Sequence, residues 1–412
     1  MFSKDKVFMA MPSRILFGCG ERAALPALLN KLGYRNALIV TDQFFSQNSP
    51  IIGDLRAALE GAQVASMVFD GGQPDPSLAL CAAALAWSRA HAGAVPFDHV
   101  IAVGGGSNID LAKALSITLK YGGDAQDYVG EGRLPGKPLP LVAIPTTSGA
   151  GSELTPGAIL IGDADSPKVA LMDNDLRPVI VVVDPELTLS CPPRVTADAG
   201  IDALTHAIES YLTCDSDRFE RGTNPDPGYS GRNHLTRVFA AESIRLCFAS
   251  LETAYRDGTD LEARTAMAYG SLMAAFSYGS AGLNAVHALA YALANQTHAT
   301  HGSTNAAFLP YVMDSLLPVR QAELAEIGRM AGLAGDDEAA LARAAVARTR
   351  ALVGALGIPT TLRQCGIEEG DLETLVQGGL GVARLTKAFP IQPAEQAYRA
   401  IVRNAYEGKL AG

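Results

Sequence analysis

The stretch that decides the fold is "HVIAVGGGSNIDLAKAL", residues 99–115. An apolar run typical of a strand leads into three glycines, and a helical segment is expected to open at Ser107. Glycines let the backbone approach a phosphate closely, and the free N–H groups at the start of a helix favour an anion. We therefore predict that Gly104, Gly105, Gly106 and Ser107 bind the pyrophosphate of a nucleotide cofactor. The alternative is a tight turn without a ligand, since the GxGxxG fingerprint of an ordinary Rossmann fold is absent.

Four further apolar runs lie on either side of this stretch. They are "NALIVTD" (36–42), "ASMVFD" (65–70), "PLVAIPTT" (140–147) and "VIVVVDPE" (179–186). Continuous apolar strands that alternate with helical stretches predict a parallel sheet covered by helices on both faces. We therefore expect residues 1–188 to form an α/β dinucleotide-binding domain.

The pattern changes after the pair Pro192-Pro193, which we interpret as a hinge because two prolines continue neither a helix nor a strand. Long segments rich in Ala and Leu follow, with helical periodicity and few strand signals. These segments lie at 236–256, 261–279, 284–295, 321–334 and 337–355. We expect residues 189–412 to form an all-helical domain that binds a metal and the substrate.

The composition excludes several classes of protein. A chain of 412 residues that is 48% hydrophobic and 18% charged is globular and long enough for two domains. A net charge of -10 without a cluster of Lys or Arg argues against a nucleic-acid partner. Residues 265–313 carry no Asp, Glu, Lys or Arg, but their glycines, amides and histidines favour core helices over a membrane span. Scattered cysteines without a CxxC pair fit a reducing cytoplasm.

Two other strand ends carry polar residues suited to a cofactor. Asp42 ends one strand, where a carboxylate accepts hydrogen bonds from an adenosine ribose and repels the 2′-phosphate of NADP(H). A later strand ends in hydroxyl groups that we expect on the nicotinamide side. These belong to Thr146, Thr147, Ser148 and Thr155. The alternatives are a helix N-cap at Asp42 and turn-forming roles for the hydroxyl residues.

A second short stretch, "GIDALTHAIESY" (200–211), points to a metal. Asp202 and His206 lie four residues apart in a helical segment, so both side chains point to one place. The charge-free segment adds His287, His298 and His301. A carboxylate with several imidazoles and no thiolate suits Fe(II) or Zn(II), although a lone histidine on an apolar face is usually a core residue.

These motifs together resemble the iron-containing (group III) alcohol dehydrogenase family over nearly the whole chain. The motifs are "GGGSNIDLAK" (104–113), "IPTTSGAGSELT" (144–155), "DALTHAIE" (202–209) and "VHALAYALANQTHATHG" (286–302). The resemblance implies a dehydroquinate synthase-like fold and a catalytic Fe(II), with Zn(II) as the alternative. It implies a metal ligand set made of Asp202, His206, His287 and His301.

The resemblance also implies that the protein binds NAD(P)(H), and Asp42 favours NAD(H) over NADP(H). The matching positions are Asp42, the loop from Gly105 and Gly106 to Ser107, the turn from Thr146 and Thr147 to Ser148, Thr155 and Lys168. Asp75 stands where many members carry Asn near the nicotinamide ribose, which keeps an acceptor but adds a charge. Ala150 stands where Thr is usual, which removes a hydroxyl contact.

Tyr291 marks a further departure from the family. Some members have a histidine at this position, four residues after ligand His287, that is proposed to relay protons to solvent. Tyrosine has an ordinary pKa near 10 and is the poorer relay at neutral pH. We therefore name His298 as the substitute relay, and a packed aromatic with a satisfied hydroxyl is the alternative for Tyr291.

The implied reaction is hydride transfer between NAD(H) and a small alcohol or aldehyde, with the site in the cleft between the two halves. The loop "RFERGTNPDPGYSGRN" (218–233) resembles an insertion in the hydroxyacid-oxoacid transhydrogenase and 4-hydroxybutyrate dehydrogenase branch. Its Arg218, Arg221 and Arg232 suggest an aldehyde that bears an anionic group, because guanidinium groups bind carboxylates and phosphonates. Solvated surface arginines are the alternative.

Three other functions stay open at this point. A transhydrogenase would use the same residues but retain NAD and exchange hydride between two organic acids. A metal-dependent lyase of the dehydroquinate synthase type would share the fold, and a non-catalytic metal-binding scaffold would leave the cofactor turns without a purpose. Homodimers are common in the family, but no interface can be read from the sequence.

Overall fold

The computed structural model describes residues 2–162 and 168–410. The strands are β1 (Arg14–Phe17), β2 (Asn36–Val40), β3 (Ala65–Phe69), β4 (His99–Gly104), β5 (Gly130–Glu131), β6 (Leu141–Pro145), β7 (Gly157–Ile161), β8 (Lys168–Met172) and β9 (Ile180–Val183). Six of them form one parallel sheet in the order β1-β9-β6-β4-β2-β3. The predicted parallel sheet is thereby confirmed, and the five expected runs are β2, β3, β4, β6 and β9.

Helices cover both faces of this sheet. They are α1 (Leu25–Leu32), α2 (Gln43–Gln47), α3 (Ile51–Gly61), α4 (Leu78–His91) and α5 (Gly106–Tyr121). Alternate residues of the strands pack into two separate cores, one with α4 and α5 and the other with α1 and α3. Burial on both faces explains why these strands read as continuous apolar runs.

A smaller sheet was not predicted. It has the order β5-β8-β7, with β7 antiparallel to β8, and β5 precedes β6 in the chain whereas β7 and β8 follow it. β5 has only two residues, and β7 and β8 are partly exposed, so none of the three produces a long apolar run.

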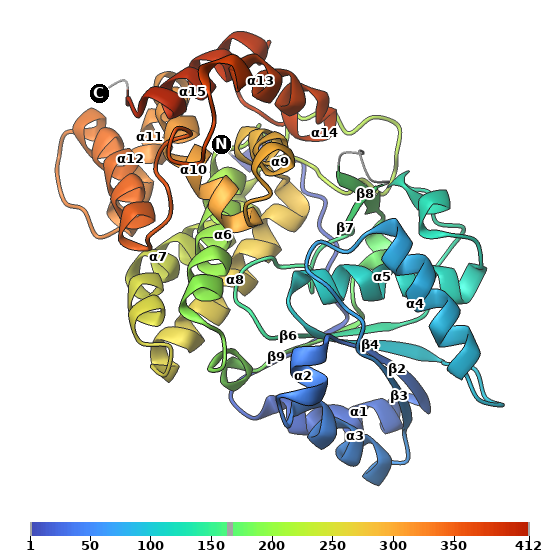
Figure 1. The fold of residues 1–412 in the computed structure, drawn as a ribbon. Coiled ribbons are helices and arrows are strands. Elements are labelled where there is room, and N and C mark those ends of the chain that lie inside the picture. The colour runs from blue at the N-terminus through green and yellow to red at the C-terminus, as the bar shows by residue number, and fades with distance from the viewer. Residues whose placement is uncertain (1, 163–167, 411–412) are drawn as a thin grey trace.

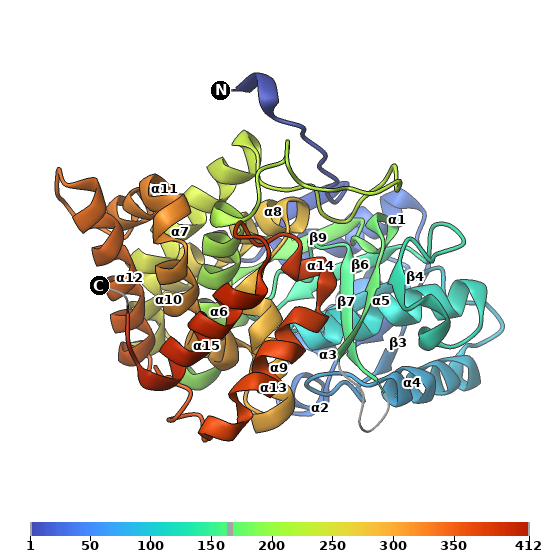
Figure 2. The same ribbon diagram turned by 90° about the horizontal axis from the view of Figure 1, so that it is seen from above.

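The chain from Pro193 onward is helical, as expected. The helices are α6 (Pro193–Leu212), α7 (His234–Arg256), α8 (Leu261–Ala281), α9 (Ala285–Thr297), α10 (His301–Ser315), α11 (Leu317–Met330), α12 (Glu338–Ala355), α13 (Leu372–Gly381), α14 (Ala383–Thr386) and α15 (Glu395–Glu407). Figure 1 shows this helical half beside the sheet half, with α6 and α8 close to the boundary. Figure 2 shows α9 and α13 running side by side, and both α13 and α14 pack against α9.

The charge-free segment forms the centre of the helical half. Residues 265–313 run through α8, α9 and α10, and most of their apolar side chains belong to one large core. Among the helices of the described chain, none has both the length and the apolar character of a membrane span. The core-helix interpretation of this segment is therefore confirmed.

Candidate active site

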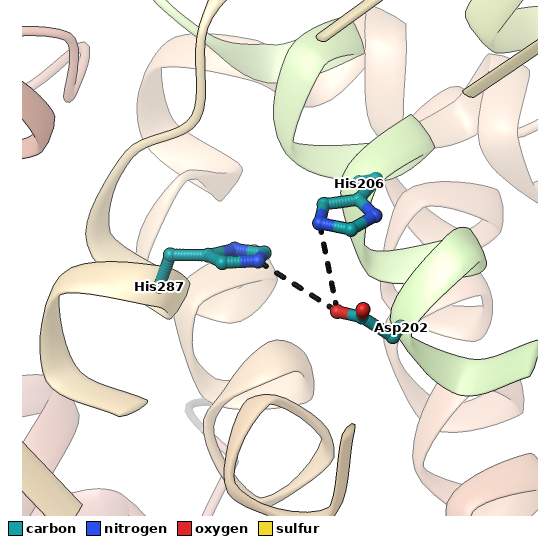
Figure 3. Close-up of side chains that lie close together, drawn as sticks. All are labelled: Asp202, His206 and His287. Carbon is teal, nitrogen blue, oxygen red and sulfur yellow. Dashed lines mark ion pairs between the residues drawn. The ribbon is translucent and has the colours of Figure 1, made fainter. Parts of the chain in front are cut away.

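Three helices bring the predicted metal ligands together. Asp202 and His206 lie one turn apart on α6, His287 lies in the first turn of α9, and His301 begins α10. From Oδ1 of Asp202 to the Nε2 atoms of His206, His287 and His301 the distances are 3.6, 3.7 and 3.8 Å. Figure 3 shows the two histidines His206 and His287 directed at the carboxylate of Asp202.

A glycine allows this convergence. An ideal Cβ at position 302 would lie 2.0 Å from the backbone oxygen of Asp198, which no side chain tolerates. Gly302 directly follows His301, so its missing side chain lets the start of α10 lie against α6. This close approach places His301 beside Asp202.

The cluster fits a divalent metal ion. The ligand atoms of Asp202, His206 and His287 all lie within 4.8 Å of one another and are buried. Ligands bound at roughly 2 Å around a tetrahedral ion lie roughly 3–4 Å apart, which matches the distances from Asp202. Nδ2 of Asn305 contacts Oδ1 of Asp202 at 2.8 Å and Nε2 of His287 at 3.2 Å, so the ligand atoms face one shared point.

The charges of the cluster also suit a metal. Burial alone would raise the pKa of Asp202, but the neighbouring histidines outweigh burial and hold that pKa well below its usual range. Burial lowers the pKa of His206 to about 4 and that of His301 to about 3. The carboxylate is therefore ionised and both imidazoles are neutral at pH 7, which is the state that binds metals.

Glu209 is a member of the site that the sequence analysis missed. Its Oε2 contacts Nδ1 of His287, while its Oε1 accepts hydrogen bonds from the backbone N–H groups of Asn284 (3.1 Å) and Val286 (2.8 Å). Burial would lower the pKa of His287, but Glu209 and Asp202 outweigh burial and raise it to about 10. With Nδ1 occupied by Glu209, Nε2 of His287 is directed at the cluster. This pKa keeps His287 protonated at pH 7, so a metal ion bound to Nε2 would displace a proton.

A signal for Glu209 was present in the sequence. It lies seven residues after Asp202 on the same helix, and residues i, i+4 and i+7 share one face. A carboxylate that continues the Asp202 and His206 face of an apolar helix is a candidate partner for one of the ligands.

The cluster opens into a cavity of about 420 Å³ between the two halves. Twelve of the predicted site residues line it: Asp75, Gly105, Gly106, Ser107, Thr147, Thr155, Lys168, Asp202, His206, His287, Tyr291 and His301. The first seven come from the sheet half and the last five from the helical half. The structure therefore places the glycine turn and the cluster of proposed metal ligands around one cavity.

A second cavity, of about 620 Å³, shares lining residues with the first and is also lined by residues from the other two predicted strand ends. Asp42 and Thr146 line it, and Gly105, Ser107 and Thr147 line both cavities. Asp42 also caps α2 by accepting hydrogen bonds from two backbone N–H groups, so its capping role and its place in the cavity occur together. Two joined cavities with the glycine turn between them have the layout that a dinucleotide requires.

Asp75 and Lys168 meet at the cavity wall. Nζ of Lys168 lies 2.6 Å from Oδ1 of Asp75, and the backbone N–H of Asp75 donates to Oγ of Ser107 at 3.2 Å. The carboxylate that replaces the usual Asn is therefore balanced by the charge of Lys168.

Three predicted residues outside the 218–233 loop do not line the cavities, and one of them is Gly104 at the end of β4. Ser148 lines neither cavity. His298 is exposed and ends α9 in a left-handed conformation. It lies eleven residues after His287, which is about 16 Å along a helix, so the shared helix carries it away from the cluster.

The arginines of the 218–233 loop do not reach the metal cavity either. Arg232 is buried and pairs with Asp215 at 2.7 Å and Glu323 at 2.6 Å. Arg221 donates to the backbone oxygen of Lys6, and Arg218 is exposed. The proposed contact of these arginines with the substrate is therefore wrong for Arg232, whose charge is already neutralised, and has no support in the positions of the other two.

The loop instead contributes Tyr229, and the C-terminal segment contributes Arg384. Both line the metal cavity, and neither was predicted. Arg384 lies on α14, and its Nη2 donates to the hydroxyl of Tyr291 at 3.4 Å. Arg384 belongs to no motif and lies far from the ligands in sequence, so only the packing of α14 on α9 reveals it.

Comparisons with known proteins show which family the chain belongs to. The family model described as "Iron-containing alcohol dehydrogenase" matches residues 12–185, and a second, "Fe-containing alcohol dehydrogenase family, C-terminal", matches residues 229–406. Long-chain-alcohol dehydrogenase 1 of Geobacillus thermodenitrificans (strain NG80-2) is 34% identical over 398 residues, which are 95% of this chain and 95% of that protein. 4-hydroxybutyrate dehydrogenase of Cupriavidus necator is 33% identical over 399 residues, 94% of this chain and 96% of that protein.

A solved structure also matches this chain over nearly its whole length. The crystal structure of sulfoacetaldehyde reductase from Bifidobacterium kashiwanohense in complex with NAD+ has a TM-score of 0.84 and 25% identity, and the match covers 98% of this chain and 100% of that chain. Both halves of the chain thus match one family in sequence and in fold. The chain belongs to the iron-containing alcohol dehydrogenase family, whose members are oxidoreductases.

Proposed function

We propose that this protein is a metal-dependent oxidoreductase that transfers hydride between NAD(H) and a short alcohol or aldehyde, and that it reduces an aldehyde bearing an anionic group. The observation that carries the proposal is the single cavity that joins the glycine turn of the sheet half to the Asp202 cluster of the helical half. A nicotinamide and a small carbonyl compound would meet there.

In the proposed site, Asp202, His206, His287 and His301 hold Fe(II), with Zn(II) as the alternative because both ions accept the same ligands. The bound ion would act as a Lewis acid toward a carbonyl or alcohol oxygen, and NADH would supply the hydride. Glu209 fixes the orientation of His287, and the ring of Tyr278 stacks on His206 with ring centres 4.0 Å apart. These contacts hold the ligand atoms in place before the substrate arrives.

The sheet half would bind the cofactor. The N–H groups at the start of α5 face the place of the pyrophosphate, since the helix begins at Gly106 within the cavity wall. Asp42 would accept hydrogen bonds from the adenosine ribose and repel a 2′-phosphate, which favours NAD(H) over NADP(H). Thr147, Thr155 and the pair of Asp75 with Lys168 would line the nicotinamide side.

The position of His298 makes it a poor proton relay, so we assign that role to groups at the cavity wall. The hydroxyl of Thr300 donates to Oδ1 of Asp198 at 2.8 Å, and both residues line the cavity. This carboxylate and hydroxyl pair would accept the proton of an alcohol through water. Tyr291 would position the substrate beside His301, with ring centres 5.8 Å apart.

The anionic substrate has support from two sources. The relatives include proteins named for 4-hydroxybutyrate and sulfoacetaldehyde, which carry a carboxylate and a sulfonate. The cavity of this chain has a guanidinium, Arg384, in its wall.

We also propose a cytoplasmic location for the protein, because all six cysteines are free thiols.

The test is anaerobic NADH oxidation by metal-free protein to which Fe(II) or Zn(II) is added back. Turnover is expected only with added metal, and with an aldehyde carrying a carboxylate in preference to the neutral aldehyde of equal length. Failure to oxidise NADH with either metal would overturn the proposal. Exchange between paired hydroxy and oxo acids without free NADH would identify a transhydrogenase instead.

A further inference from the structure

We propose that Arg384 is the residue that binds the anionic group of the substrate, and that this group is a carboxylate or another oxyanion on a short carbon chain. The inference rests on the proposed function and names the part of the cavity that selects the substrate. It replaces the arginines of the 218–233 loop, which the sequence had suggested as one of two alternatives.

The guanidinium of Arg384 has no carboxylate partner among the described residues. Lys168 and Arg384 are the lysine and arginine side chains that line the metal cavity. Lys168 pairs with Asp75 at 2.6 Å. Within residues 2–162 and 168–410, Arg384 pairs with no carboxylate, and its partners are the phenol groups of Tyr291 and Tyr229. Neutral partners leave the guanidinium free to pair with an anion that enters the cavity.

Arg384 also stays charged where it lies. Burial by itself would lower its pKa, but the oxygens of Tyr291 and Tyr229 outweigh burial and raise that pKa. A partly desolvated guanidinium without a counter-ion is costly, and an anionic ligand removes this cost by forming two parallel hydrogen bonds with the planar fork.

The position of Arg384 limits the length of the substrate. The guanidinium carbon lies 5.9 Å from the ring centre of Tyr291, and that ring lies 5.8 Å from the ring of His301. One aromatic side chain therefore touches both Arg384 and a proposed metal ligand. An aldehyde whose oxygen is at the metal cluster would need only a few carbons to place its far end at Arg384.

The 218–233 loop contributes to the proposed anion site through Tyr229 and not through its arginines. Tyr229 belongs to the 218–233 loop and lines the same cavity, and Gly282 gives its ring room, since a Cβ at position 282 would lie 2.9 Å from that ring. The loop thus contributes a phenol group that orients Arg384, while its own arginines form other contacts.

The test compares the zinc- and NADH-loaded protein with its Arg384→Gln and Arg384→Lys variants, and uses Arg218→Gln as the matched control on the exposed loop. Binding of two unreactive amides is measured by calorimetry: succinamate, which carries a carboxylate, and butyramide, which is neutral. We expect the original protein and the control to bind succinamate at least tenfold more tightly than butyramide. Arg384→Gln should lose this preference and Arg384→Lys should keep part of it, with butyramide binding unchanged in both.

The possible outcomes distinguish a failure of the role of Arg384 from a failure of the proposed function. Equal affinity for both amides in the original protein, or a preference lost only in Arg218→Gln, would overturn the role of Arg384. Metal-dependent turnover of butanal would in that case still support hydride transfer from NADH to a short aldehyde, which is the part of the proposed function that does not depend on an anionic group. An Arg384-dependent preference for succinamate in a protein that never oxidises NADH would support the anion site and overturn the reaction.

Discussion

The carboxylate of Glu209 determines which ring nitrogen of His287 faces the other proposed metal ligands. Glu209 contacts Nδ1 of His287 and is itself held by two backbone N–H groups, so its position is fixed before any metal binds. We expect Glu209→Gln to weaken metal binding by about 10- to 100-fold, because carboxylate partners of ligand histidines contribute that much. Competition with a chelator measures the affinity.

The control for this change is Glu242→Gln. Glu242 forms an exposed pair with Arg245 at 2.6 Å, so its substitution removes a carboxylate without touching the cluster. Equal metal affinity of the two variants would show that Glu209 does not orient His287.

Arg232 forms ion pairs with two carboxylates, those of Asp215 and Glu323. Its side chain is 6% exposed, while those of Asp215 and Glu323 are 34% and 17% exposed. We expect Arg232→Gln to lower the free energy of unfolding by about 3 kcal/mol at pH 7, near the low end for buried pairs because Asp215 is partly exposed. Denaturant unfolding measures this loss, and the preference for succinamate over butyramide should not change.

This loss should depend on pH. Burial alone would raise the pKa values of Asp215 and Glu323, but the charges of Arg232 and Arg320 outweigh burial and lower both. A lowered carboxyl pKa stabilises the fold above its ordinary value near pH 4, and that stabilisation disappears as the pH falls through the folded value. The difference between the two proteins should therefore shrink below about pH 4. A constant difference down to pH 3 would mean that packing, and not charge, explains the loss.

The sequence revealed the residues of the site unevenly. Asp202 and His206 could be paired because a helix places i and i+4 on one face, and the same rule extends to Glu209. The positions of His287 and His301 around them came from a family motif. Arg384 and Tyr229 could not be predicted, since their approach to the cavity depends on how α14 packs against α9 and how an irregular loop pairs with the end of α8.

At the scale of elements, buried strands were easier to predict than exposed ones. Four of the five predicted strands, β2, β4, β6 and β9, are apolar because both of their faces are buried, whereas the edge strand β3 is partly exposed. The short edge strand β1 and the partly exposed β7 and β8 lack this signal. The helices of the second half were predicted well, because their periodicity reflects a single large core.

The start of α5 is the element on which the cofactor proposal depends. A Cβ at position 105 would lie 3.6 Å from Oγ1 of Thr147, an ordinary contact, so Gly105→Ala leaves the fold intact. The added methyl would project from the wall that both cavities share. We expect the dissociation constant of NADH to rise about tenfold, a cost of about 1.4 kcal/mol, with an unchanged affinity for metal. Fluorescence titration with NADH measures the effect.

Gly53→Ala is the control for this prediction. Gly53 lies inside α3, and nothing lies within 4 Å of the position that its Cβ would take. NADH affinity should stay unchanged in this variant. If Gly105→Ala also bound NADH normally, the glycine turn would be a tight turn without a ligand.

At the scale of the whole molecule, the two halves share a core. Val181 and Val183 of β9 pack into the same apolar cluster as α6 to α10, while their neighbours Ile180 and Val182 face the opposite core. Phe17 of β1 stacks on Tyr269 of α8 with ring centres 3.7 Å apart. Alternate residues of the sheet therefore connect the helical half to the sheet half, and residues of both halves line the cavity.

This shared core predicts that a ligand of one half stabilises the other. All four proposed metal ligands lie in the helical half, whereas Trp87, the only tryptophan of the chain, lies on α4 of the sheet half. Zinc at about 100 times its dissociation constant should stabilise the fold by about 2.7 kcal/mol and raise the melting temperature by about 3 °C. Melting followed by Trp87 fluorescence and by far-UV circular dichroism should give one midpoint that shifts as a unit. Asp202→Asn should abolish the shift, and a shift seen only by circular dichroism would mean that the halves unfold separately despite their common core.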